Sequence, residues 1–306
     1  MASLTKFLNN TRSQIDKLEY GGVPRPYLGM SGIGFHCMRS IWLSFHWADT
    51  SKYTARTERI FNLGHLFEPM IIKQIKDAGM EVYKMIPDTE QNREENLEYE
   101  LVDGQLKLPH HGHQEEKQEE YIGYAKHAMG HSDGRIKGLI EAPEIEHLLE
   151  IKTMKEIYFK ELCKVGIKKG HSTYYGQAQR YMRATGLEWA FFIVINKNTS
   201  HIYVERIKYN DADAQDLVRK ETVIIMSNLV PENPYSKNYY KCDMCFQKEV
   251  CKGRIPISKN CRSCIHCDIE NEGKWSCSYK DGKILSVEEQ RNGCGKYKLG
   301  WGLENL

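Results

Sequence analysis

The sequence predicts an α/β protein whose mixed central β-sheet is flanked by helices. Two apolar, strand-like runs lie between Gly130 and Lys152, and a further pair at 189–195 and 202–207 is typical of a hairpin. Helical patterns precede the first strands, separate them from the hairpin and follow the hairpin. The order helix, strands, helix, hairpin, helix is typical of a mixed sheet with helices on its faces.

The N-terminal part is predicted to be mostly helical. Residues 1–30 have the pattern of a polar helix followed by a turn. Ser31 is expected to cap an amphipathic helix that carries Cys37, Ile41 and Phe45 at four-residue spacing.

A long helix is expected over 55–85, with Pro69 at its start or at a kink. The acidic stretch 86–129 has little periodicity and is expected to hold two or three short strands with loops. Its clustered histidines are more typical of an exposed loop than of a metal site, and they are His110, His111 and His113. Further helices are predicted over 155–164, 171–184 and 211–229.

The composition is that of an ordinary soluble globular protein. The chain has 306 residues, of which 41% are hydrophobic and 27% are charged, enough for one large domain or two smaller ones. A formal net charge of +2 does not by itself indicate a nucleic-acid binder, so any basic surface must be local. Residues 1–20 contain no long apolar run, and no segment has the apolar length of a membrane span, so we expect neither secretion nor membrane insertion.

Two carboxylates and a lysine are spaced as a divalent-metal site requires. Because side chains alternate along a strand, Glu150 and Lys152 are expected on one face while Ile151 points into the sheet. Asp133 on the neighbouring strand can then share a Mg²⁺ with Glu150, since hard cations take carboxylate oxygens together with water and phosphate. This arrangement suits attack on a phosphodiester, although Glu-x-Lys also arises by chance on a charged strand edge.

Cysteines are the second strong feature. The chain has ten, eight of them between Cys242 and Cys294, and a chain without a secretory signal uses such clusters for metal or cluster ligation rather than disulfides. Pro231 and Pro234 mark the boundary before this part. The predicted organisation is a helical N-terminal segment at 1–54, a core at 55–230, a cysteine segment at 231–255 and a cysteine-rich tail at 256–306.

Four motifs in order resemble the PD-(D/E)xK nuclease superfamily, in its RecB-like branch. They are Gly64-x-x-x-Glu68, Asp133, Glu150-Ile151-Lys152 and Gln177-x-x-x-Tyr181. The Glu68–Pro69 pair looks like phage exonucleases of the YqaJ and lambda exonuclease kind. The resemblance covers roughly 64–207, and the acidic insertion at 86–120 is not part of its pattern.

The resemblance implies a restriction-endonuclease-like core and a deoxyribonuclease that depends on Mg²⁺ or Mn²⁺, with exonuclease favoured over endonuclease by family likeness alone. Lys152 would orient or deprotonate the attacking water, and Gln177 would position Lys152 or the water. The metal ligands implied are Glu68, Asp133, Glu150 and the Ile151 carbonyl. Three tyrosines either stack on an unpaired base or pack in the core, and they are Tyr174, Tyr175 and Tyr181.

The cysteines add a second resemblance, to the iron–sulfur staple of AddB and of CRISPR-adaptation nucleases. One cysteine before the core and Cys-x2-Cys-x5-Cys after it form this set, which is Cys37, Cys242, Cys245 and Cys251. Such a four-iron, four-sulfur cluster would tie the N-terminal helix to the segment after the core, and zinc at the same sulfurs is the alternative.

A zinc-ribbon-like site is predicted in the tail. Its four sulfurs, two from a tight knuckle and two from later turns, are those of Cys261, Cys264, Cys277 and Cys294. Cys267 and His266 leave the choice of ligands open, because Cys264-x2-Cys267 is also a knuckle. Cys163 is left over and is interpreted as a buried apolar residue.

The implied partner is DNA, as single strands or duplex ends, with a recombination or replication protein as a further partner and the cytoplasm of a bacterium or phage-infected cell as the location. Candidate phosphate contacts, each alone more typical of a solvated surface charge, are Lys155, Lys168, Lys169, Arg180 and Arg183. The alternative function is a non-catalytic or weakly catalytic DNA-binding or interaction protein on the same fold. The intact Asp/Glu/Lys set argues against it, and no glycine-rich phosphate loop supports a nucleotide hydrolase or a methyltransferase.

Overall fold

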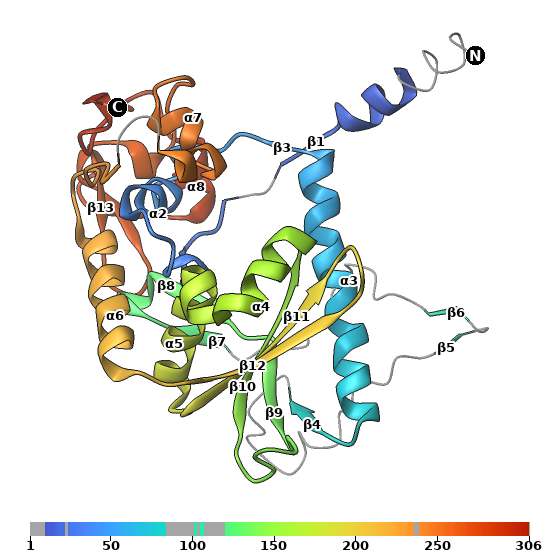
Figure 1. Ribbon diagram of the computed structural model, residues 1–306. Helices are drawn as coiled ribbons and strands as arrows, with labels where there is room; N and C mark the ends of the chain where they lie inside the picture. Colours follow the sequence, from blue (N-terminus) through green and yellow to red (C-terminus); the bar gives the residue numbers. More distant parts are fainter. Residues whose placement is uncertain are drawn as a thin grey trace.

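A five-stranded mixed sheet forms the centre of the molecule (Figure 1). The computed structural model describes residues 10–21, 24–83, 101–102, 105–106, 120–235 and 239–305. The strand order is β12-β11-β10-β9-β4, in which β10 and β11 run parallel and the other neighbours run antiparallel. The strands are β4 (Glu81–Tyr83), β9 (Gly134–Lys137), β10 (His147–Met154), β11 (Trp189–Asn196) and β12 (Ile202–Lys208).

One face of this sheet is covered by the long helix α3 (Ala55–Asp77), which contains Pro69 in its interior. Ile71, Ile72 and Ile75 of α3 pack in one buried cluster with Leu149 and Ile151 of β10. Helices therefore flank a mixed sheet, and the predicted fold class is confirmed.

The opposite face of β10 turns toward α5 (Ser172–Thr185). Leu148 and Met154 of β10 belong to a separate, larger cluster that includes Ala178 and Met182 of α5. Because side chains alternate along a strand, Glu150 and Lys152 lie on this α5 face. The same layer contains α4 (Glu156–Gly170) and α6 (Asp211–Met226).

The N-terminal helix begins later than the sequence suggested. Ser31 lies inside a short 3-10 turn, η1 (Met30–Gly32), and Cys37 is the residue that precedes α2 (Met38–Phe45). Between these two elements the chain crosses the start of α5 so closely that a Cβ on Gly34 would overlap the Ser172 carbonyl. The short strands paired nearby are β1 (Glu19–Tyr20) with β3 (Tyr53–Thr54), and β2 (Leu28–Gly29) with β8 (Ala128–His131), which in turn pairs with β7 (Glu120–Ile122).

The acidic stretch 86–129 is described only in part. Within it the structure shows β5 (Leu101–Val102), β6 (Gln105–Leu106), β7 and η3 (Tyr124–Lys126). The three clustered histidines lie outside the described residues. No described helix is both long and apolar enough to cross a membrane.

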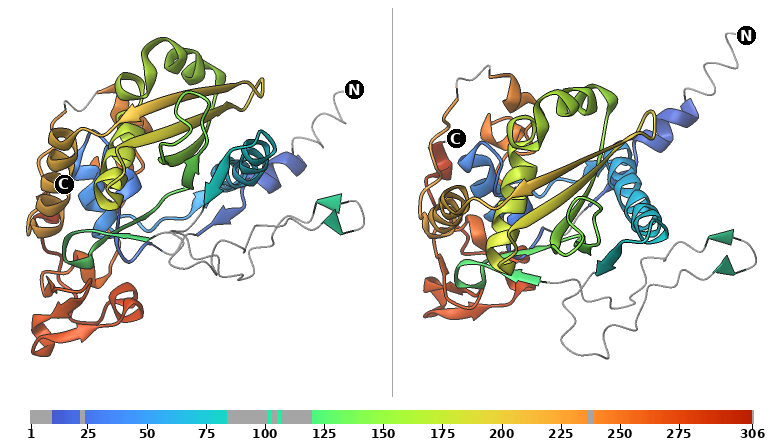
Figure 2. Two further views of the ribbon diagram at one scale, coloured as in Figure 1. Left: turned by 90° about the horizontal axis from the view of Figure 1, so that it is seen from below. Right: turned by 60° about the horizontal axis from the view of Figure 1, so that its bottom comes forward.

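The cysteine-rich part folds as short elements against the N-terminal helix α2, and both views of Figure 2 place it away from α3. Buried Arg262 joins the two parts, with its guanidinium 3.9 Å from the ring centroid of Trp47 and 4.5 Å from that of Trp275. Trp275 and Trp42 belong to the same buried cluster, so the tail shares a core with the N-terminal segment. Its elements are η4 (Tyr240–Met244), α7 (Lys248–Cys251), η5 (Cys261–Ser263), β13 (Cys267–Ile269), β14 (Trp275–Cys277), η6 (Ser278–Lys280), β15 (Lys283–Leu285), α8 (Val287–Asn292) and η7 (Leu303–Asn305).

Candidate active site and cysteine clusters

Asp133 sits in the tight connection between β8 and β9. The next residue, Gly134, has a φ of 137°, a left-handed value that glycine adopts without strain. Asp133 Oδ2 accepts a hydrogen bond from the backbone N–H of Ile151 at 2.7 Å and another from Lys152 Nζ at 3.3 Å. The aspartate is thereby fixed against β10, although it lies in the connection just before β9 and not within the strand as expected.

Glu150 and Lys152 form a close ion pair within β10. Glu150 Oε2 lies 2.6 Å from Lys152 Nζ, and Glu150 Oε1 accepts a hydrogen bond from Gln177 Nε2 at 3.3 Å. Burial raises the pKa of Glu150 to about 7; the Lys152 charge opposes this rise, and the negative charges of Asp133 and Glu68 add to it. Burial disfavours the charged form of Lys152, but the two carboxylates outweigh it and raise the pKa of Lys152 above its usual value.

Glu68 lies on α3, the helix that packs against β10. Its side chain is half-buried, and its charge is one of the causes that raise the pKa of Glu150, which places it within electrostatic range. His65, one turn earlier on the same helix, is exposed. Glu68 and Gln177 therefore come from two different helices, α3 and α5, that cover opposite faces of the sheet.

Tyr181 is a core residue rather than an exposed stacking platform. It is 1% exposed, its ring centroid lies 4.8 Å from that of Tyr121, and a Cβ on Gly130 would lie 2.5 Å from its ring. Of the two alternatives for this tyrosine, the structure favours packing in the core. Tyr174, one turn before Gln177, is half-buried and has Lys152 Nζ 5.8 Å from its ring centroid.

Sequence reasoning missed the residue pair next to Asp133. The hydroxyl groups of Tyr121 and Ser132 are 2.7 Å apart, and both side chains are buried. This hydrogen bond anchors Ser132, the residue directly before Asp133, to β7. Only the adjacency of Ser132 to Asp133 could have indicated the role, because Tyr121 lies in the poorly patterned stretch.

The five residues expected to contact phosphate differ in exposure and in their ion pairs. Lys155 and Lys169 are exposed, whereas Lys168 pairs with Asp213 at 3.0 Å and Arg183 pairs with Asp211 at 2.9 Å. Arg180 does not fit the expectation. It is buried, and its guanidinium donates two hydrogen bonds to Glu221 at 2.9 and 3.2 Å, so it has no path to a phosphate.

Across the described ranges, no three His, Cys, Asp or Glu side chains meet as a ready-made metal-binding group. At the carboxylate cluster, the ammonium of Lys152 lies between Asp133 and Glu150. Glu150 Oε2 is buried and makes no aligned hydrogen bond to any described residue, although the ammonium is close. Such an oxygen retains lone pairs that a divalent cation can use.

The first cysteine set converges between α2 and the segment 242–251. All four of its sulfur-bearing residues line one cavity of about 710 Å³, whose other lining residues include Arg39 and Lys252. Ser40 Oγ lies 3.1 Å from Cys245 Sγ. Burial raises the pKa of the Cys37 thiol, and the nearby Cys245 and Cys251 add to this rise.

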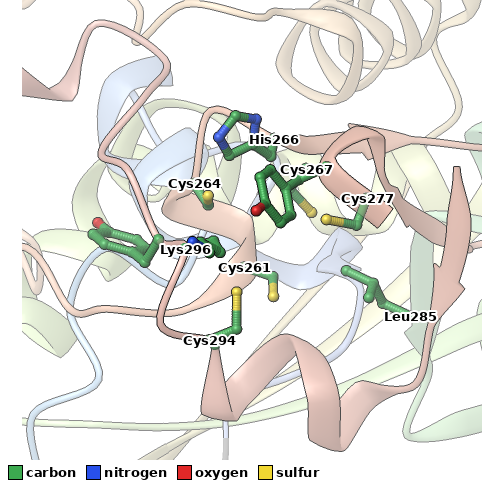
Figure 3. A pocket seen from close by; sticks show the side chains of 11 residues that line it. Cys261, Cys264, His266, Cys267, Cys277, Leu285, Cys294 and Lys296 are labelled. Carbon is green, nitrogen blue, oxygen red and sulfur yellow. The ribbon is translucent and has the colours of Figure 1, made fainter. Parts of the chain in front are cut away.

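The second set surrounds a small pocket in the tail (Figure 3). Its volume of about 10 Å³ has room for one ion, and burial together with Cys264, Cys294 and Cys277 raises the pKa of Cys261 to about 11. Cys267 also lines the pocket, because it faces Cys277 across the β13–β14 ladder. Five thiols and His266 therefore line the same pocket. The remaining cysteine, Cys163, is exposed on α4 rather than buried as expected.

Comparisons with known proteins give a weak likeness to nucleases. Neither a protein-family model nor a curated protein matches this chain. Among solved structures, the alkaline exonuclease LHK-Exo from Laribacter hongkongensis is 15% identical, with a TM-score of 0.40 over 66% of this chain and 87% of that chain. LHK-Exo in complex with dAMP is also 15% identical, with a TM-score of 0.40 over 65% and 86% of the two chains. The structure of SSO0001 is 14% identical, with a TM-score of 0.41 over 82% and 95%. Because these values are low, the likeness carries no functional argument, and the function must be argued from the residues of the site.

Proposed function

We propose that this protein is a deoxyribonuclease that uses Mg²⁺ or Mn²⁺ to hydrolyse phosphodiester bonds. The observation that carries the proposal is the ion-paired group of buried Glu150 with the partly buried Asp133 and Lys152, in which Gln177 is hydrogen-bonded to Glu150. Buried charges are costly unless they are paired, and groups with strongly shifted pKa values cluster at functional sites. The resemblance of the motif order to PD-(D/E)xK nucleases supports the same assignment.

The donor set fits a hard divalent cation. Asp133 and Glu150 would hold it, together with Glu68 and the Ile151 carbonyl, and Glu150 Oε2 has lone pairs that no aligned hydrogen bond from a described residue uses. When bound, the ion would lower the pKa of a bound water and neutralise charge on the scissile phosphate.

Lys152 acts on the phosphate and the attacking water in this proposal. Its two carboxylate neighbours keep it charged at neutral pH, so its ammonium can donate a hydrogen bond to the water or to a phosphate oxygen. Because a raised pKa makes a lysine a poor base, we propose orientation and charge stabilisation rather than removal of a proton. Gln177 holds the Glu150 carboxylate in place for this chemistry.

We further propose that the two cysteine sets hold metal. Cys37, Cys242, Cys245 and Cys251 would ligate a four-iron, four-sulfur cluster, with zinc as the alternative, and their cavity is large enough for a cluster. Cys261, Cys264, Cys277 and Cys294 would ligate zinc, with Cys267 or His266 as alternative ligands, and the one-ion size of their pocket suits a single metal.

The finer aspects of the proposal rest on family likeness. They are exonuclease action at single-stranded or duplex DNA ends, a role in phage or mobile-element recombination or repair, a recombination or replication protein as partner, and a cytoplasmic location.

The test is incubation of the full-length, anaerobically purified protein with end-labelled single- and double-stranded DNA. Cleavage is expected with Mg²⁺ or Mn²⁺ and none with EDTA, and the Lys152→Ala protein prepared in the same way excludes a contaminating nuclease. DNA that is bound but not cleaved under every metal condition would instead support the non-catalytic DNA-binding alternative.

A further inference from the structure

The loop before Cys37 packs directly against α5, the helix that carries Gln177. A Cβ on Gly176 of α5 would lie 2.6 Å from the Cα of Gly34, and a Cβ on Gly34 would overlap the Ser172 carbonyl. No side chain fits in such a contact, so the backbones of the loop and of α5 pack directly against each other. Cys37 follows Gly34 by three residues.

Lys220 of α6 holds this loop from the other side. Its ammonium donates hydrogen bonds to the carbonyls of Ile33 and Phe35, at 2.8 and 2.5 Å, and these two residues bracket Gly34. The amine is half-buried and within electrostatic range of the Cys37 sulfur. A thiolate at Cys37 would therefore be a counter-charge for this lysine.

Residues in the first turns of α5 contact β10, the strand that holds Glu150 and Lys152. Tyr174 packs beside the ammonium of Lys152, and Gln177 is hydrogen-bonded to Glu150. A shift of the loop against Gly176 would therefore displace groups that hold the Glu150–Lys152 pair.

We propose that Lys220 is a positioning residue that couples the Cys37 site to α5. When Cys37 can no longer act as a ligand, the first turns of α5 should shift and displace Gln177. The proposal rests on the proposed metal-ligand role of Cys37, and its consequence on cleavage rests on the proposed nuclease function. Hydrogen exchange measures the coupling separately from cleavage.

Hydrogen exchange of the full-length protein tests the coupling. In Lys220→Met, which keeps the stem and removes the donor, exchange in peptides covering 33–37 and 172–177 should accelerate about tenfold or more, because two carbonyls lose a charged donor. Lys220→Arg should restore most of the protection. Arg219→Met is the matched control, since Arg219 is the adjacent exposed residue of α6 and pairs with Asp216; it should leave both peptides unchanged.

A double-mutant comparison separates coupling from simple loss of stability. Cys37→Ser should accelerate exchange at 172–177 in protein with Lys220 but add little in the Lys220→Met background. Chelator-treated protein with and without Lys220 gives the same comparison if Cys37→Ser does not fold. If Lys220→Met accelerates exchange uniformly, including in β11, Lys220 has only a structural role and the proposal is overturned. Unchanged exchange at 172–177 in both the Cys37→Ser and the chelator-treated protein would also overturn it.

Cleavage assays test whether this coupling affects catalysis. Lys220→Met should lower kcat with little change in KM, because it disturbs the placement of catalytic groups and not a substrate contact. An unchanged kcat alongside faster exchange would overturn the functional consequence. If the unaltered protein cleaves no DNA, the nuclease proposal fails while the exchange measurements still decide the coupling.

Discussion

The ammonium nitrogen of Lys152 lies 2.6 Å from Glu150 Oε2, two residues earlier on the same strand, and 3.3 Å from Asp133 Oδ2. The single positive charge of Lys152 offsets part of the negative charge of these two carboxylates. If the proposed metal binds the same oxygens, we expect it to compete with the lysine.

Lys152→Met should bind Mn²⁺ about tenfold more tightly than the unaltered protein at pH 8, because two carboxylates lose their counter-charge. Cleavage by the same variant should fall by about 10²–10⁴-fold, the usual contribution of a positioned catalytic group. Calorimetric Mn²⁺ titration and end-labelled DNA check the two effects. Lys160→Met, at an exposed lysine of α4 paired with Glu156, is the control. Weaker Mn²⁺ binding by Lys152→Met would show that the lysine does not lie in the metal's place.

Glu150→Ala should abolish metal-dependent cleavage while the protein remains folded, because it removes a ligand and frees Lys152 from its partner. Cleavage rates and circular dichroism check this outcome. Glu146→Ala is the control, since Glu146 is partly exposed and pairs with Arg135. Near-normal cleavage by a folded Glu150→Ala protein would mean that the site has been assigned wrongly.

Glu68→Ala should raise the metal concentration needed for half-maximal cleavage by about tenfold or more, or abolish activity, because it removes one anionic ligand. His65→Ala should have a smaller effect, since His65 is exposed on the same helix. Metal titrations of both variants compare the two residues directly. The reverse order of effects would place the ligand on His65.

Metal affinity should depend on pH through Glu150. Its pKa is raised to about 7 in the metal-free protein, so below pH 7 the carboxyl is protonated and a cation must displace that proton. The Mn²⁺ affinity should therefore fall by up to about tenfold for each pH unit below 7 and level off above it. Titrations at pH 6, 7, 8 and 9 check the slope, and Glu150→Gln should remove it. A constant affinity from pH 6 to 8 is the result that speaks against this account.

The two cysteine sites should differ in their metal and in what their loss does. Elemental analysis and visible absorption should show iron that is lost in Cys242→Ser and zinc that is lost in Cys277→Ser. Both substitutions should lower the thermal unfolding temperature, because Trp275 and Trp42 share one buried cluster. A colourless protein with two zinc ions and no iron would retain both sites and exclude the cluster. Protein without bound metal at either site would exclude both.

The sequence alone determined the class of the sheet and the placement of Glu150 and Lys152 on one face of β10. Period-two alternation placed Glu150 and Lys152 on one face and Ile151 on the other, because a strand has no alternative geometry for them. The long helix α3, the hairpin of β11 and β12, and the helix carrying Gln177 followed from equally local patterns. Cysteine spacing grouped the sulfurs within each knuckle, because a knuckle is also a local structure, whereas Cys37 was joined to Cys242, Cys245 and Cys251 only by a family resemblance.

Only the tertiary structure decided which side chains are available to act. Arg180 reads as a surface cation in the sequence, yet Glu221 from a helix far along the chain holds it in the core. Tyr181 is enclosed by Gly130 and Tyr121, and Lys220 meets the Cys37 loop, through contacts that no local pattern encodes. Burial and partnership depend on which distant segments pack together, so the sequence could name the chemistry of a residue but not its surroundings.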